Sequence, residues 1–479
     1  MSARFPLLIP GARPGATLDV VAPFDRSPIA VVEIADAAAA EVALATAHSL
    51  FRDRQRWLPA EKRIEVLRRA AELVAARREE LALGAAQEGG KPLTDSLVEV
   101  DRAVDGLRCC IEALRTGHGR EIPMRLNPAS ANRLAMTTLE PIGPVLAYSA
   151  FNHPLNLIVH QVGPAIAAGC PVLIKPAQST PLSCLRLVQI LREAGLPGPW
   201  CQPLVLADHA LSEQLVADRR VAFFSFIGSA SVGWGLRSKL APGARCALEH
   251  GGVAPVIVAA DADLDDAVPL LTKGGFYHAG QVCVSVQRVF ADRRLATQLA
   301  DRLAAAADKL KVGDPTLPHT EVGPLIRPSE VARVDEWVSE AVVAGGKKLC
   351  GGRPLSETTY DPTVLFDPPD HVRVSTHEVF GPVVCMYPYD NMDDAIRRAN
   401  ALPFAFQAAI FTKDVDTALA AARSLDASAV MINDHTAFRV DWMPFAGLRE
   451  SGLGVGGIPY TMHDMQTEKL IVFRSPGLM

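Results

Sequence analysis

Residues 144–175 read PVLAYSAFNHPLNLIVHQVGPAIAAGCPVLIK. This pattern predicts a strand, a helix and a second strand, in that order, at 145–149, 155–168 and 171–174. The alternation continues with predicted helices and strands at 182–194, 204–206, 211–217 and 221–226. Strands that alternate with helices are typical of an open, mostly parallel, doubly wound sheet, in which ligands bind at the carboxyl ends of the strands.

A second alternation begins after Gly251-Gly252. Its predicted strands lie at 256–258, 379–387 and 408–411, and its predicted helices lie at 264–271 and 295–310. At 479 residues the chain exceeds what one hydrophobic core usually serves. We therefore expect two α/β domains, with the second starting near residue 250.

Different patterns flank these two domains. Residues 1–35 predict edge strands and loops, and helical spacing follows at 37–89 and 97–116. Strand-like runs at 124–126 and 133–139 flank a turn and predict a hairpin, with which a C-terminal strand at 469–473 could pair. Because an isolated hairpin is marginal in water, we expect this one to pack on a partner subunit in a homodimer or homotetramer.

Composition excludes several functional classes. The net charge is −5 and no basic run is present, which argues against nucleic-acid or anionic-membrane partners. No apolar segment reaches the roughly 18 residues of a membrane span, and the N-terminus lacks an apolar signal core. The nine cysteines form no CxxC pair, so we expect reduced thiols and a cytoplasmic protein. The twelve histidines show no metal-ligand spacing, so no metal site is expected.

One cysteine has an unusual setting. Residues 274–284 read GGFYHAGQVCV and place Cys283 behind two glycine-bearing turns. Most unpaired cysteines are small buried hydrophobes. Tight backbone beside open space can instead present a reactive thiol.

Six stretches support the second interpretation of Cys283. They are residues 148–154, 175–178, 226–229, 248–252, 280–283 and 378–382, which read YSAFNHP, KPAQ, FIGS, LEHGG, GQVC and EVFGP. Their order and spacing resemble the NAD(P)-dependent aldehyde dehydrogenase superfamily, from about residue 20 to the C-terminus.

The resemblance implies a fold with three parts. These are a Rossmann-like NAD(P)-binding domain at 1–119 and 141–248, an α/β catalytic domain at 249–440, and a small β oligomerisation element at 120–140 and 460–479.

The resemblance also implies a reaction. An aldehyde is a poor hydride donor, whereas the tetrahedral adduct that it forms with a thiolate expels hydride readily. Cys283 matches the family's nucleophile, and Asn152, together with the Cys283 backbone N–H, matches the donors to the developing oxyanion. Glu249 matches the base that activates water to hydrolyse the thioester. Its presence argues against a coenzyme A-acylating relative, and the set of Cys283, Asn152, Glu249 and Glu378 argues against a dormant nucleotide-binding relative.

Cofactor residues follow in the same way. The resemblance assigns the pyrophosphate turn to Gly228, Ser229 and Gly233. It assigns the adenosine ribose to Lys175. The nicotinamide end would be bound by Glu378, Phe380 and Phe151. Gln178 stands where many NAD-preferring members carry Glu, which would repel a 2′-phosphate. The cofactor is therefore NAD or NADP, with NAD slightly favoured.

Several positions depart from the family pattern or bear on the substrate. His250, beside Glu249, either tunes the base or is a structural imidazole, and Gly456 stands where many members carry a Glu of a proton relay. Val282 and Val284 would line a modest pocket. Arg439 could bind a carboxylate, phosphate or sulfonate, or could pair with Asp441 or another structural carboxylate. We expect a small polar or anionic aldehyde as the substrate.

Overall fold

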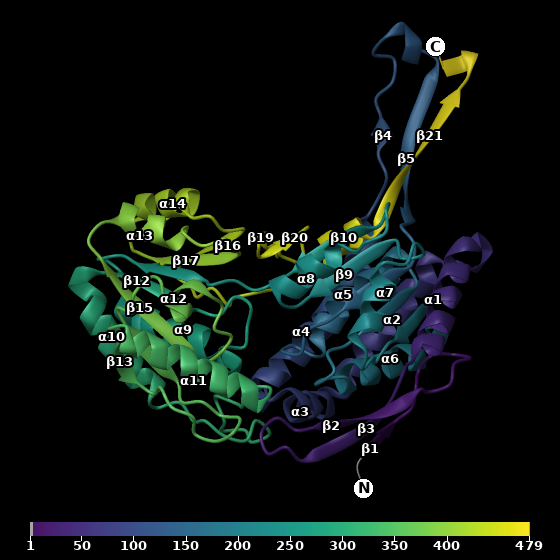
Figure 1. The fold of residues 1–479 in the computed structure, drawn as a ribbon. Helices are drawn as coiled ribbons and strands as arrows, with labels where there is room; N and C mark the ends of the chain where they lie inside the picture. Colours follow the sequence, from purple (N-terminus) through teal and green to yellow (C-terminus); the bar gives the residue numbers. More distant parts are fainter. Residues whose placement is uncertain (1–2, 479) are drawn as a thin grey trace.

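A computed structural model describes residues 3–478 of the chain. Two α/β lobes lie side by side, and a long β arm projects from the first lobe (Figure 1). None of the helices in the described part of the chain is both long and apolar enough to cross a membrane.

The first lobe contains a six-stranded sheet with the order β20-β10-β9-β6-β7-β8. Its strands span Gly452–Leu453 (β20), Arg245–Glu249 (β10), Phe223–Ile227 (β9), Val145–Tyr148 (β6), Val172–Lys175 (β7) and Cys201–Pro203 (β8). All neighbours are parallel except β20, which runs antiparallel to β10. The strand expected at 204–206 lies three residues earlier, because after the bond from Leu204 N–H to the Ile174 carbonyl the chain leaves the sheet.

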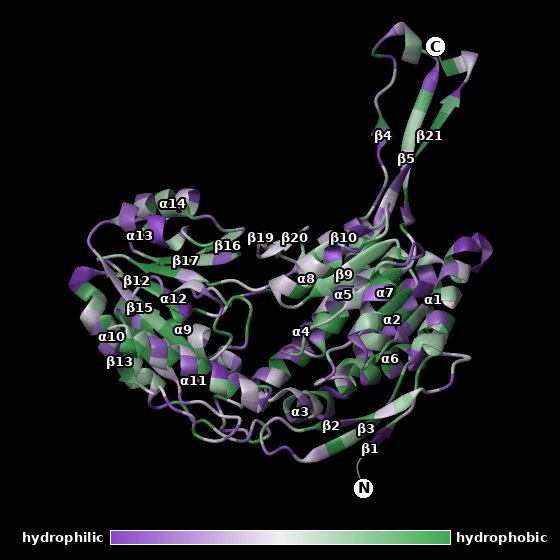
Figure 2. Ribbon diagram, in the orientation of Figure 1, coloured by the Kyte–Doolittle hydropathy of each residue, from purple (hydrophilic) through white to green (hydrophobic). Residues whose placement is uncertain are grey.

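Helices cover both faces of this sheet. They span Ala37–Arg52 (α1), Ala60–Ala76 (α2), Arg78–Gly89 (α3), Leu93–Thr116 (α4), Asn156–Ala168 (α5), Leu182–Glu193 (α6), His209–Val216 (α7) and Ala230–Arg237 (α8). One core lies under α2, α4, α5 and α6, and a second lies under α1 and α7. The sheet is therefore buried between two layers of helices, and its strands are largely hydrophobic in the hydropathy colouring (Figure 2).

The second lobe contains a seven-stranded sheet with the order β13-β14-β15-β12-β11-β17-β18. Its strands span Lys347–Cys350 (β13), Thr363–Phe366 (β14), Val383–Tyr389 (β15), Arg288–Asp292 (β12), Pro255–Val258 (β11), Gln407–Phe411 (β17) and Ala429–Ile432 (β18), and β13 alone is antiparallel. The strand expected at 379–387 begins later, because Phe380 has a φ of 47° and Pro382 has no N–H to donate.

One core joins this sheet to its helices. They span Leu264–Phe276 (α9), Arg293–Ala307 (α10), Pro328–Val343 (α11), Arg373–Thr376 (α12), Met392–Ala399 (α13) and Val415–Ser424 (α14). The short strands Phe404–Ala405 (β16) and Leu448–Arg449 (β19) pair where the chain crosses back toward the first lobe.

The chain then returns to the first lobe. Helix α15 (Ile458–Asp464) packs on α4 and α5, and Ile458 and Met462 are buried in the first-lobe core. Residues 460–464 were expected in the oligomerisation element, but their apolar face places them in the body. The chain enters the arm with β21 (Gln466–Arg474).

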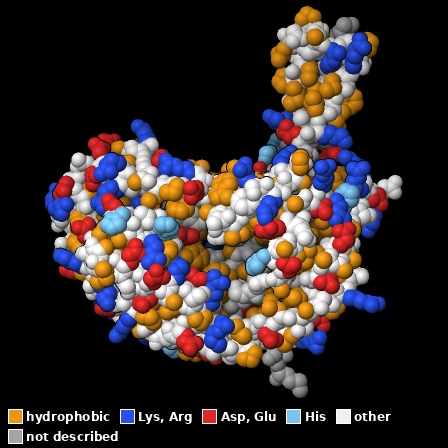
Figure 3. All heavy atoms as spheres, in the orientation of Figure 1, with side chains coloured by type: hydrophobic (Ala, Val, Ile, Leu, Met, Phe, Trp, Pro, Cys, Tyr) orange, Lys and Arg blue, Asp and Glu red, His pale blue; other side chains and the backbone are white. Residues whose placement is uncertain are grey.

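The arm is a three-stranded sheet with the order β21-β5-β4. β21 pairs antiparallel with β5 (Arg133–Pro141) from Gln466 to Arg474, so the expected pairing of the C-terminal strand with this hairpin is confirmed. The other hairpin strand is β4 (Glu121–Ile122) rather than 124–126, because Arg125 has a left-handed φ of 65° that breaks the strand. Apolar side chains form several patches on the visible face of the arm, among polar and basic ones (Figure 3).

A small N-terminal sheet, order β1-β3-β2, lies along the first lobe beside α6. Its strands span Ala3–Phe5 (β1), Ala16–Val21 (β2) and Pro28–Ile34 (β3).

A buried ion pair fixes the start of α5. Lys91 Nζ contacts Glu99 Oε2, and both side chains are fully buried. The other oxygen of Glu99 accepts the backbone N–H groups of Leu155 and Asn156, each at 2.9 Å. These bonds satisfy two donors at the start of the helix and hold the preceding loop, which carries Asn152.

Candidate active site

Cys283 lies on the loop that follows α9. After this helix the chain passes through His278, Ala279 and Gly280 with φ values of 49°, 54° and 69°. A Cβ on Gly280 would lie 2.1 Å from the carbonyl oxygen of Gly381, so only glycine fits there. This left-handed run turns the chain sharply and places Cys283 where the two lobes face each other.

The thiol of Cys283 is half-buried against a small apolar cluster. Its members are Val282, Val284, Phe406 and Phe445, so the two expected pocket valines do lie beside the cysteine. Burial raises the pKa of the Cys283 thiol, the negative charge of Glu249 raises it further, and Arg439 partly offsets both. The resting thiol is therefore protonated at neutral pH and must lose its proton before it can attack.

Asn152 reaches the cysteine loop from the opposite lobe. Its side chain is buried, and Nδ2 donates a hydrogen bond of 2.9 Å to the carbonyl of Gln281. A primary amide has a second N–H, which this bond leaves available. The structure thus brings Asn152 within two residues of Cys283, as the sequence predicted.

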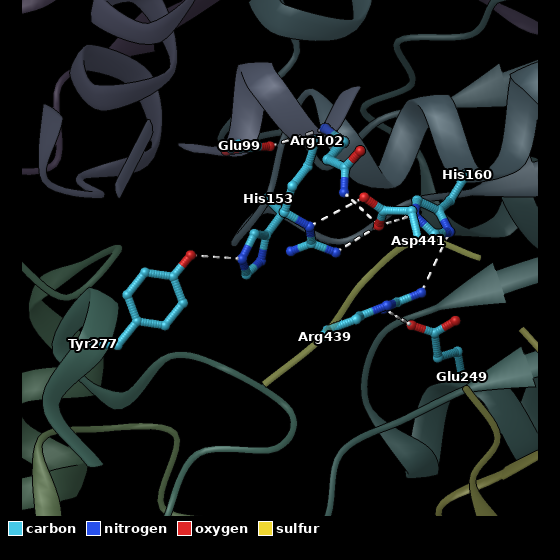
Figure 4. A network of polar contacts seen from close by, with 9 residues as sticks. Glu99, Arg102, His153, His160, Glu249, Tyr277, Arg439 and Asp441 are labelled. Atoms are coloured by element: carbon cyan, nitrogen blue, oxygen red, sulfur yellow. Dashed lines mark hydrogen bonds and ion pairs between the residues drawn. The ribbon is translucent and has the colours of Figure 1, made fainter. Parts of the chain in front are cut away.

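Glu249 lies at the carboxyl end of β10, where Arg439 is its neighbour (Figure 4). Arg439 Nη1 lies 3.4 Å from Glu249 Oε1. A Cβ on Gly456 would come within 2.9 Å of Glu249 Oε2, so a larger residue at 456 would crowd the carboxylate. Arg439 therefore pairs with Glu249 and not with Asp441, the structural alternative considered from the sequence.

Asp441 belongs to a second polar group that sequence analysis missed. Arg102 donates to its two oxygens at 2.6 and 3.2 Å, and His160 Nε2 lies 2.6 Å from Oδ1. Burial raises the pKa of Asp441, but His160 and Arg102 outweigh it and hold the pKa well below its usual range. Arg102 and Asp441 are separated by 339 residues, and no local pattern marks such a pair.

The first-lobe residues expected to meet the adenosine ribose follow β7. Lys175 Nζ lies 5.3 Å from the ring centroid of Tyr148, and burial lowers the pKa of this lysine. Gln178 Nε2 donates to the carbonyls of Leu206 and Ala207 at 2.7 and 3.1 Å. Because carbonyls only accept, these bonds fix the amide orientation and leave Gln178 Oε1 as the free acceptor.

The expected pyrophosphate turn precedes α8 and contacts His250. Gly228 and Ser229 lie between β9 and this helix, and His250 Nδ1 donates to the Gly228 carbonyl at 2.9 Å. His250 Cε1 lies 1.9 Å from where a Cβ on Gly233 would be, so Gly233 makes room for the imidazole. The ring also packs against Phe226 and Trp234, which supports the structural role for His250.

The expected nicotinamide-side residues come together between the lobes. The rings of Phe151 and Phe380 meet edge to face with centroids 5.8 Å apart. Glu378 Oε1 is buried and has no hydrogen-bond partner among the described residues, and a Cβ on Gly251 would lie 1.7 Å from it. A buried acceptor without a donor fits a ligand hydroxyl, such as that of the ribose which the resemblance implies.

The surface between the lobes is hollowed (Figure 3). Within residues 3–478 no three His, Cys, Asp or Glu side chains cluster as metal ligands would. The arrangement offers a nucleophile, a carboxylate and oriented N–H donors beside acceptors for a nucleotide.

Comparison with known proteins agrees with this arrangement. The model of the family described as "Aldehyde dehydrogenase family" matches residues 11–471. A 3-sulfolactaldehyde dehydrogenase of Priestia aryabhattai is 38% identical over 455 residues, which cover 95% of this chain and 94% of that protein.

Two solved structures are also similar. Aldehyde dehydrogenase 21 from Physcomitrella patens, in complex with the reaction product succinate, has a TM-score of 0.95 and 33% identity and covers 100% of both chains. Glyceraldehyde-3-phosphate dehydrogenase from Methanocaldococcus jannaschii, complexed with NADP, has a TM-score of 0.91 and 34% identity and covers 97% of this chain and 100% of its own.

These matches confirm the expected fold class, family and kind of cofactor. The chain belongs to the aldehyde dehydrogenase family of oxidoreductases, which use NAD or NADP.

Proposed function

We propose that this enzyme oxidises a small polar or anionic aldehyde to a carboxylic acid through a thiohemiacetal and a thioester on Cys283. The observation that carries the proposal is the meeting of Cys283, Asn152 and the Glu249–Arg439 pair between the lobes. Each member comes from a different part of the chain, and together they supply the groups that the reaction needs.

The first step forms a bond between the sulfur and the aldehyde carbon. The thiol proton leaves to solvent water, and the carbonyl oxygen becomes an oxyanion. The free N–H of Asn152 and the backbone N–H of Cys283 are the donors available to that oxyanion. One such donor typically contributes about 100- to 1000-fold in rate.

The second step oxidises the adduct and the third hydrolyses it. Bound NAD or NADP supplies a hydride acceptor, which leaves a thioester on Cys283. Glu249 then takes a proton from water, the water oxygen bonds to the acyl carbon, and the carbon–sulfur bond breaks. A half-buried carboxylate beside the thioester supports hydrolysis over transfer to coenzyme A.

The charge in the pocket supports an anionic substrate. Apolar side chains pack around Cys283, and Arg439 is the cation that acts on its thiol, beside the carboxylates of Glu249 and Glu378. By their names, three of the similar proteins act on 3-sulfolactaldehyde or glyceraldehyde-3-phosphate or yield succinate. Each of these compounds carries an anionic group, a sulfonate, a phosphate or a carboxylate, that a guanidinium can bind through two parallel hydrogen bonds.

The orientation of Gln178 supports a slight preference for NAD. Its free Oε1 can accept a hydrogen bond from a ribose 2′-hydroxyl. The same oxygen offers no donor to a 2′-phosphate, although Lys175 nearby leaves NADP usable.

The arm supports assembly into a homodimer or homotetramer. Leu470, Val472 and Phe473 are about half exposed on β21, and a projecting apolar sheet gains stability when a partner covers it. The thiols are all unpaired, in keeping with a cytoplasmic location.

The proposal predicts a substrate pattern. Across neutral, hydroxylated, cationic and anionic small aldehydes, NADH or NADPH formation should be fastest with an anionic one. Cys283→Ser should lower it at least about 1000-fold, since a hydroxyl is a poor nucleophile at neutral pH. Turnover that persists in this variant, or no turnover with any aldehyde, would contradict the proposal.

Glu378 predicts a pH-dependent stability. Burial raises the pKa of Glu378 from an ordinary value near 4.5 to about 8, and Arg333 offsets part of this. Between these values the folded protein holds a proton that the unfolded chain has lost, so stability falls as the pH rises. Glu378→Gln removes this loss. In urea unfolding of the cofactor-free enzyme, the variant's advantage should therefore grow from about pH 5.5 to about pH 8.5. A constant difference would show that Glu378 titrates normally.

The arm predicts an assembly defect. Leu470 and Val472 are two residues apart on β21 and share one face of the strand. Leu470→Asp/Val472→Asp should shift the enzyme toward monomers in sedimentation velocity, because a partner would have to bury two charges. Val415→Asp, on the exposed side of α14, is the matched control. Unchanged sedimentation of the double variant would exclude this face of the arm as the interface.

A further inference from the structure

The guanidinium of Arg439 is a buried cation with weak partners. Its side chain is 9% exposed, and its polar contacts are both long: 3.4 Å to Glu249 Oε1 and 3.3 Å to His160 Nδ1. Its Nε is buried and has no hydrogen-bond partner among the described residues. Since a guanidinium carries five N–H donors, most of the binding capacity of Arg439 is unused.

The surrounding charges leave Glu249 as the counter-ion of Arg439. Asp441 is already engaged by Arg102 in a two-point contact. His160 donates from Nε2 to Asp441, so its Nδ1 is the lone-pair nitrogen that accepts from Arg439. Burial and the Arg439 charge lower the pKa of His160, which keeps this ring neutral. Among the described residues, Glu249 is the only carboxylate that forms an ion pair with Arg439.

The pocket holds both partners of this pair in place. The Arg439 Cζ lies 3.5 Å from the ring centroid of Phe445, so one face of the guanidinium is covered. Gly456 leaves the room that Glu249 Oε2 occupies. The carboxylate that should activate water therefore rests against an arginine instead of lying free beside the thioester (Figure 4).

We propose that Arg439 couples substrate recognition to hydrolysis: it restrains Glu249 until the anionic group of the substrate takes over the guanidinium and releases the carboxylate. The inference rests on the proposed function and adds a control step to it. A buried cation needs a counter-ion at every stage, and the substrate anion replaces Glu249 in that role. The released Glu249 accepts the proton of water, whose oxygen bonds to the acyl carbon while the sulfur departs with the electron pair.

The coupling acts on one step of the reaction. A neutral aldehyde can still acylate Cys283 and yield one equivalent of NADH, because that step does not require water. Its thioester then hydrolyses slowly, since nothing displaces Glu249 from Arg439. An anionic aldehyde supplies the displacing group itself and turns over without delay.

The test supplies the two parts of the substrate separately. Wild-type enzyme with NAD and propanal should show a burst of about one NADH per Cys283 and then a slow steady state. Methanesulfonate, at an ionic strength matched with sodium chloride, should raise the steady-state rate by about tenfold and shrink the burst. Dimethyl sulfone, a neutral molecule of similar shape, should change neither.

A variant that removes the charge of Arg439 provides the second part of the test. Arg439→Gln should turn over propanal without a burst of NADH, and methanesulfonate should not change its rate. Its KM for an anionic aldehyde should be about 10- to 100-fold higher than that of the wild-type enzyme. Arg293→Gln removes an exposed arginine of the second lobe and should behave as wild type in all three respects. Thermal unfolding and NAD binding show whether each variant is folded. The experiment with propanal and methanesulfonate on the wild-type enzyme needs no variant.

Failure of the inference differs from failure of the proposed function. If anionic aldehydes are oxidised through Cys283 but propanal shows no burst and no response to methanesulfonate, the coupling is wrong and the function stands. A burst that persists in Arg439→Gln, with the response to methanesulfonate intact, would also overturn the coupling. If Cys283→Ser retains activity, both fall.

Discussion

The hydrogen bond from Asn152 to the carbonyl of Gln281 joins the two lobes at the site of chemistry. It brings together a loop that follows the first-lobe sheet and the loop that carries Cys283. Both loops are held from behind. Glu99 fixes the start of α5 after Asn152, and the left-handed run that ends at Gly280 fixes the approach to Cys283. The proposed donor and the proposed nucleophile are thus held in place before substrate arrives, which is the condition for efficient stabilisation of an oxyanion.

Much of this fold could be predicted from the sequence, because its buried strands and helices are long and apolar. The strand–helix–strand unit at 145–175 is found with bounds close to those expected. The misplaced boundaries have local causes that hydrophobic pattern does not reveal. Left-handed backbone at Arg125 and Phe380 keeps these two residues out of strands in which the apolar pattern would have included them. The placement of α15 depends on a distant surface of α4 and α5 and so could not be predicted from its own residues.

The candidate site divides in the same way. Residues in short linear motifs, such as Asn152, Glu249 and Cys283, could be named from the sequence and prove to be neighbours. The partners of those residues could not, because each contact joins distant segments. Arg439 meets Glu249 across 190 positions, and Arg102 meets Asp441 across 339. The charge balance of the pocket depends on these long-range pairs, so the proposals on the substrate and on the control of hydrolysis are argued from contacts that no motif marks.

The central claim is that Cys283 carries an acyl group between oxidation and hydrolysis. Glu249→Gln should block the release of that group, because an amide cannot take a proton from water. Intact-protein mass spectrometry of this variant, after incubation with NAD and an aldehyde substrate, tests the claim directly. The account predicts a mass gain equal to the aldehyde less two hydrogen atoms, located on the peptide that contains Cys283 and removed by hydroxylamine. Formation of NADH without an adduct, or an adduct on another of the nine cysteines, would contradict it.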